Sequence, residues 1–158
     1  MSRRVMSAAV LAVAVVVATG HPASADMSKP VISAFRGQFV VTQDELPDGK
    51  NDKDTIAKIK KAQLKELTGT AQEDVTSWSF HYTAFLTKTG AKNLKMRFMK
   101  GKQLSADKQL DGIDPKSTVL TGDININEDE GLAKGNTYTI ELVNASDAVV
   151  AKTTLVMK

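Results

Sequence analysis

Apolar and polar residues alternate most regularly in the segment that runs from Val75 to Lys88. From Trp78 to Leu86 every second residue is apolar, and serine, histidine and threonine occupy the positions between them. A period of two is typical of a β-strand that buries one face, because successive side chains point to opposite sides of a sheet. Phe85 alone breaks the pattern. The segment therefore predicts a long strand whose aromatic residues belong to the core and do not line a ligand groove.

The same alternation predicts further strands in the rest of the chain. Residues 94–99 alternate again after turn residues at 89–92, so the two strands are expected to form a hairpin. Residues 101–116 contain Asp-Gly and Asp-Pro pairs and are expected to be a loop. Additional strands are predicted at residues 31–42, 119–127, 137–144 and 149–157.

A helical period occurs in residues 54–67. Isoleucine and leucine recur there at intervals of three to five residues, and lysines occupy much of the remaining surface. Asp52 or Asp54 can cap the first turn, and Gly69 follows the last apolar residue. A helix of this length is marginal alone, so its apolar stripe must pack on another element.

About six or seven strands separated by turns predict a mainly β fold, an antiparallel β-sandwich with one inserted α-helix at about 54–67. Within residues 132–142, Gly135 is followed by Tyr138, Ile140 and Leu142 at alternate positions. This C-terminal portion resembles the corner of immunoglobulin-like and fibronectin type III-like sandwiches of bacterial exported proteins. The resemblance implies that Tyr138 is a structural tyrosine corner, whose hydroxyl group bonds to upstream backbone. It implies no function, because such sandwiches serve as adhesins, chaperones, carbohydrate modules and spacers.

The first 25 residues have a different composition. A short basic head with Arg3 and Arg4 precedes an uncharged run rich in alanine and valine at 5–20, and Ala-Ser-Ala follows at 23–25. This order is typical of a cleavable export signal, and the run is shorter than the roughly 20 residues that span a bilayer. We expect a signal peptide at 1–25 and a single exported domain at 26–158, periplasmic or extracellular, with no transmembrane span.

Cleavage would change the charge balance. The chain has 21 basic and 18 acidic residues, and 19 basic residues remain once Arg3 and Arg4 are lost, so the net charge falls from +3 to about +1. This balance gives no support for a nucleic-acid partner. Six basic residues nevertheless lie close together without an acid among them. They are Lys88, Lys92, Lys95, Arg97, Lys100 and Lys102. They are a candidate surface for an anionic polymer or lipid, although lysines also protect sheet edges from pairing.

Few residues suited to catalysis are present. The chain has no cysteine, and His81 is the one histidine after residue 25. Cys–His nucleophiles and zinc sites with several such ligands are thereby excluded. His81 is expected on the outward face of its strand beside Ser79 and Thr83, without a nucleophile elbow. Residues 44–54 and 123–130 are oxygen-rich and therefore candidate calcium loops, but the second lacks the glycine and glutamate of an EF-hand.

The sequence therefore predicts an exported, non-enzymatic β-sandwich protein, without a catalytic residue, metal or cofactor, that acts by binding or as a structural module. One alternative is a cell-envelope protein that binds an anionic polymer or lipid through its lysine-rich hairpin and helix. A small secreted hydrolase is the second alternative. The expected partner is another protein or an anionic envelope polymer.

Overall fold

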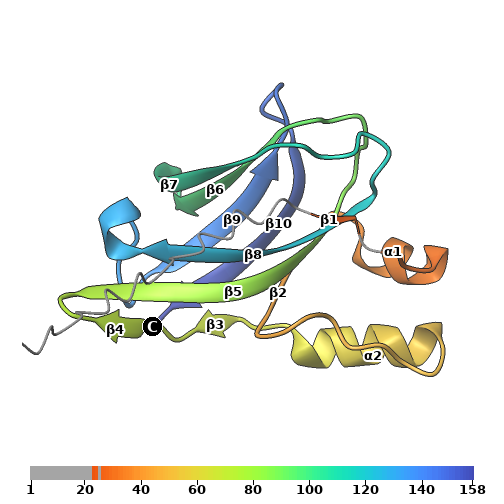
Figure 1. The fold of residues 1–158 in the computed structure, drawn as a ribbon, viewed down its shortest axis with the longest axis horizontal. Coiled ribbons are helices and arrows are strands. Elements are labelled where there is room, and N and C mark those ends of the chain that lie inside the picture. The colour runs from red at the N-terminus through yellow and green to blue at the C-terminus, as the bar shows by residue number, and fades with distance from the viewer. Residues whose placement is uncertain (1–22, 25) are drawn as a thin grey trace, which may run out of the picture.

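The computed structural model describes residues 23–24 and 26–158 (Figure 1). The predicted export signal lies outside the described residues, apart from Ala23 and Ser24. The described part is mainly β and contains two sheets of largely antiparallel strands together with two α-helices. Seven of its ten strands have four or more residues. None of its helices is long and apolar enough to cross a membrane.

The first sheet, called sheet A here, is built around the longest strand of the described part. Its members are β1 (Ala23–Ser24), β2 (Phe39–Thr42), β4 (Thr70–Gln72), β5 (Val75–Phe85) and β8 (Val119–Asn127). The order is β1-β8-β5-β2, and β4 also pairs with β5. β5 and β8 pair antiparallel from Ser77 opposite Asn127 to Phe85 opposite Val119. The alternation that predicted β5 is therefore confirmed as a strand at the centre of a sheet.

The second sheet, sheet B, contains the C-terminal strands. Its members are β3 (Glu66–Leu67), β6 (Leu94–Lys100), β7 (Gln103–Leu110), β9 (Thr137–Val143) and β10 (Val149–Met157). The order is β3-β10-β9-β6-β7, in which only β3 and β10 are parallel. The prediction of a loop at 101–116 is wrong for residues 103–110, which form strand β7. This edge strand lacks a clear apolar alternation because it buries only Ala106 and Leu110, whereas Leu104 is 49% exposed.

The expected hairpin between β5 and β6 is also wrong. β5 belongs to sheet A, β6 pairs with β7 and β9 in sheet B, and residues 86–93 cross from one sheet to the other. This connection is held at its start, where the Leu86 N–H donates to Thr118 O and the Thr87 N–H donates to Val150 O, and near its end, where Lys92 O accepts from the Ile113 N–H. Eight residues are also more than the two to five of most hairpin loops.

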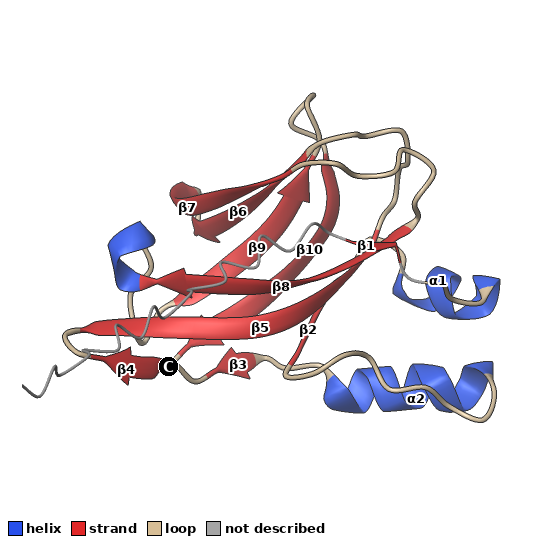
Figure 2. Cartoon of the chain, viewed as in Figure 1, coloured by secondary structure: helices blue, strands red, loops and turns tan. Residues whose placement is uncertain are grey.

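Two α-helices replace the one that the sequence predicts (Figure 2). The expected strand at 31–42 is a strand only in β2; before it lies α1 (Lys29–Phe35), with a proline in its first turn. The predicted helix at 54–67 is α2 (Asp52–Ala62), capped by Asn51, whose Oδ1 accepts from the Asp54 N–H at 3.0 Å. Residues 66–67 are strand β3 instead of helix. A short 3-10 helix, η1 (Glu128–Glu130), follows β8.

A second core explains why Phe85 interrupts the alternation of β5. The main core lies between the two sheets and includes Trp78, Phe80 and Tyr82, as expected from the sequence. Phe85 points to the other face of sheet A, where its ring lies 5.2 Å from that of Phe35. This second core lies beneath α1 and α2. Its buried members are Val31, Phe35, Val40, Ile59, Phe85 and Val119. Sheet A therefore buries apolar side chains on both faces at this end.

Tyr138 is buried and makes the contact that the sequence resemblance implies. The Ala133 N–H donates to the Tyr138 Oη at 2.9 Å, across the turn that contains Gly135. The tyrosine thus fixes the entry of β9 to the residues that precede it. The two sheets alone do not assign the chain to the immunoglobulin-like or fibronectin type III-like class, so that assignment stays an expectation.

Replacing Glu128 with glutamine is expected to lower the melting temperature at neutral pH, and this difference from wild type should close in acid. The Thr76 N–H donates to Glu128 Oε2 at 2.8 Å, and this bond lowers the pKa of the carboxyl group. A carboxylate with a lowered pKa stabilises the fold at neutral pH, and the contribution is lost as the pH falls through the lowered value.

Melting curves measured from pH 7 down to about pH 2 test this expectation, because that interval covers the titration of carboxyl groups. Asp129→Asn, which removes a charge from the same 3-10 turn, is the control. A Glu128→Gln difference that stays constant over the whole interval would contradict the expected role of Glu128.

Candidate functional site

The structure separates the six basic residues of the predicted surface into two groups. Lys88 and Lys92 lie in the connection between the sheets, and Lys95 and Arg97 lie on β6 next to it. Lys100 and Lys102 are at the opposite end of β6, around its turn to β7. The lysine-rich helix α2 covers the outer face of sheet A and does not extend this surface. The lysines of α2 therefore belong to a different part of the described surface from those next to β6.

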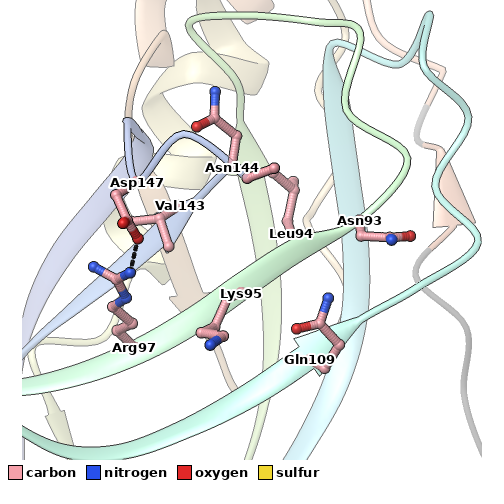
Figure 3. Close-up of a pocket in the computed structure, with 9 residues that line it drawn as sticks. Asn93, Leu94, Lys95, Arg97, Gln109, Val143, Asn144 and Asp147 are labelled. Carbon is pink, nitrogen blue, oxygen red and sulfur yellow. Dashed lines mark hydrogen bonds and ion pairs between the residues drawn. The ribbon is translucent and has the colours of Figure 1, made fainter.

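Two of the basic residues on β6, Lys95 and Arg97, have acidic partners. Arg97 forms an ion pair with Asp147 in the turn between β9 and β10 (Figure 3). The Lys95 Nζ lies 3.5 Å from an oxygen of Asp107 on the neighbouring strand β7. Lys88 and Lys92 are exposed, and neither has an ion-pair partner within the described residues. Among the four basic residues at this end of β6, the charges without an acidic partner in the described part of the chain are therefore those of Lys88 and Lys92.

A hollow of about 230 Å³ lies where β6 meets the turn at 144–148 (Figure 3). Three amide side chains line it in addition to Lys95 and the Arg97–Asp147 pair. They are Asn93, Gln109 and Asn144. The Asn144 Oδ1 accepts from the N–H groups of Ser146 and Ala148, both at 3.0 Å, which orients the amide. These side chains provide hydrogen-bond donors and acceptors in addition to charge.

A second hollow of about 400 Å³ lies on the other side of the same turn and contains Lys88 and Lys92 in its wall. It shares Asn93, Asn144 and Ala145 with the first hollow. The backbone of this region is held in place, because the Gly90 N–H donates to Pro115 O at 2.6 Å. We call the group of Lys88, Lys92, Lys95 and Arg97, which surrounds these two hollows, the basic loop end. Asp147 is the one acid in the walls of either hollow.

The basic loop end is suited to binding an anion. Ammonium and guanidinium groups form strong hydrogen bonds to carboxylate, sulfate and phosphate groups. The walls of the two hollows contain no histidine and no serine placed beside a base. They also contain no aromatic side chain on which a base or a sugar ring would stack. The arrangement therefore favours recognition of an anion with hydrogen-bonding groups around it.

His81 lies on the outward face of its strand, as expected, but the expected exposure of this histidine is wrong because the side chain is buried. It is 8% exposed, and its Nδ1 lies 2.9 Å from Asp123 Oδ1 on β8. Met27 and Leu46 pack over this face of sheet A from segments distant in sequence. Ser79, the expected neighbour of His81, forms a hydrogen bond with another residue, since its Oγ accepts from the Asn125 Nδ2 at 2.6 Å. The ring and its carboxylate partner form a pair that the sequence did not indicate.

The two candidate calcium loops form no common cage of oxygen ligands. Asp123 and Asn125 belong to strand β8, and the Asn127 side chain caps η1. In the other loop, the carboxylate of Asp54 accepts from the Lys50 N–H and pairs with Lys58; the bond from Lys50 is the main cause of its lowered pKa. Across residues 23–24 and 26–158, no three acidic or histidine side chains converge in a way that could hold a metal ion.

Comparison with known proteins adds no family to this description. The sequence matches no protein-family model and no curated protein.

Proposed function

We propose that the protein is an exported, non-enzymatic β-sandwich module that binds an anionic polymer of the cell envelope at its basic loop end. The observation that carries the proposal is the position of Lys88 and Lys92, two exposed lysines without ion-pair partners in the described part of the chain. They lie beside Lys95 and Arg97 around one turn. The export signal predicted at 1–25 supports an envelope or extracellular setting.

A polymer is a better ligand for this surface than a small anion. A single ion pair between exposed groups contributes little, because water and salt screen it. A chain with repeated anionic groups can contact both hollows at once, so that several weak contacts act together. The amides of Asn93, Gln109 and Asn144 supply hydrogen bonds to hydroxyl groups between the anionic units. An acidic polysaccharide is therefore the ligand class that these side chains fit best.

The double variant Lys88→Gln/Lys92→Gln is expected to bind an anionic polysaccharide about 30-fold more weakly at low salt, since each lysine near an anionic surface contributes about 1 kcal/mol. Heparin is a suitable probe, and the elution salt from a heparin column together with titration calorimetry measures the effect. The matched control is Lys60→Gln/Lys61→Gln, which removes the same charge from exposed positions on α2.

The expected result is a large shift for the loop variant and a small shift for the helix variant. Lys100→Gln/Lys102→Gln tests the far end of β6 in the same way. Equal shifts for all three variants would mean that only net charge matters, and passage of the wild-type protein through the column at low salt would overturn the proposal.

A further inference from the structure

A third hollow, of about 200 Å³, lies on the outer face of sheet A and contains none of the residues of the basic loop end. His81, Thr83 and Thr121 from β5 and β8 line it, together with residues that precede β2 or follow it in sequence. The latter are Met27, Glu45 and Leu46. Its volume is several times the roughly 30 Å³ that one water molecule occupies in the liquid. The hollow can therefore hold a small organic group.

Thr83 indicates that this hollow needs an occupant that forms hydrogen bonds. The residue is 0% exposed, and its Oγ1 has no hydrogen-bond partner. Among the described residues, Thr83 Oγ1 is the one buried side-chain polar atom without a hydrogen-bond partner. Thr83 is flanked in register by Val40 on β2 and Thr121 on β8. A buried hydroxyl group without a partner is costly, and most such groups in folded proteins are paired.

The polar groups around the hollow are mainly acceptors. An ionised carboxylate only accepts hydrogen bonds, so the contact between Asp123 Oδ1 and His81 Nδ1 places a hydrogen on Nδ1. When Nδ1 carries the only ring hydrogen, Nε2 is an acceptor. Glu45 adds a carboxylate, and the hydroxyl groups of Thr83 and Thr121 can accept as well. Among the described residues, no lysine or arginine lines this hollow.

We propose that this hollow binds a primary alkylammonium group. An ammonium group has three hydrogen-bond donors and a positive charge, which match the acceptors and the carboxylate of Glu45. Its alkyl chain can lie along the apolar side chains of Met27 and Leu46, as the stem of a lysine does on apolar surfaces. The group can come from a lysine side chain of a partner protein or from a free diamine, because both present the same chemistry.

Titration calorimetry of the purified protein with three probes tests the proposal. The probes are pentane-1,5-diamine, Nα-acetyl-lysine methylamide and, as an uncharged control of the same length, pentane-1,5-diol. Saturable binding of an amine with no binding of the diol is expected. Stronger binding of the lysine derivative would indicate a protein partner, and stronger binding of the diamine would indicate a free ligand.

Two variants identify the site. Glu45→Gln removes the charge at an exposed residue, and Thr83→Val removes the hydroxyl group with little change in shape. Each is expected to weaken amine binding about 5-fold, as the loss of one hydrogen bond or ion pair would. Lys88→Gln/Lys92→Gln should leave amine binding unchanged, which separates this site from the basic loop end. Equal heats from amine and diol, or amine binding that neither variant weakens, would overturn the proposal. The hollow would then contain only water.

Discussion

Replacing Phe85 with alanine is expected to lower the free energy of unfolding by about 3–5 kcal/mol, the range for deleting a buried phenylalanine side chain. Phe85 is fully buried and its ring contacts that of Phe35. It joins α1 and α2 to the outer face of sheet A, so the variant should leave a cavity between the helices and the sheet. Urea unfolding of the purified protein, followed by circular dichroism, measures the loss.

Phe85→Leu is the matched control for this variant. Leucine keeps most of the apolar volume, so the expected loss is about 1.5 kcal/mol or less. A Phe85→Ala loss as small as that of the leucine variant would show that the helices do not depend on this side chain. The second core would then not be the element that holds α1 and α2 on sheet A.

Replacing Gly131 with alanine is expected to cost about 3 kcal/mol or more, from left-handed backbone strain and from steric overlap together. Gly131 ends η1 with φ near +110°, a conformation that alanine rarely adopts. A Cβ atom at this position would lie 2.1 Å from the backbone oxygen of Ser105 on β7. Relief requires β7 to shift away from the turn after β8. Urea unfolding again measures the effect.

Gly90→Ala separates the two causes. Gly90 has a similar φ of +97°, but a Cβ atom there would meet no atom within 4 Å. Its expected cost is therefore the conformational strain alone, about 1–2 kcal/mol. Equal losses at the two positions would mean that the contact between Gly131 and β7 does not contribute.

Local patterns in the sequence predicted an element correctly where that element has one buried face. The alternation from Trp78 to Leu86 predicted β5 and its core aromatics, because side chains on a strand point alternately to its two faces. The spacing of Ile56 and Ile59 predicted α2, although the strand β3 shortened it at its C-terminal end. The tyrosine at 138 was identified from the turn before it.

Local patterns failed where a contact with a distant segment decided the outcome. α1 contains Val31 and Phe35, one helical turn apart, yet the same letters also fit a strand. β7 is an edge strand with few buried residues, and pairing with β6 supplies most of its order. Local patterns also did not predict which strands pair, because β5 and β6 are neighbours in sequence but belong to different sheets.

For the candidate sites as well, the sequence determined some features and the tertiary structure decided the others. The sequence by itself determined which residues carry charge, that the chain has no cysteine and that His81 is its one histidine after residue 25. It also predicted the elements that have one buried face, such as β5 and α2. Only the tertiary structure decided that Lys88 and Lys92 lie beside the 144–148 turn without acidic partners among the described residues, and that His81 and Thr83 line a hollow on the outer face of sheet A. Burial and pairing depend on contacts between segments far apart in the chain, and no local pattern of residues specifies these contacts.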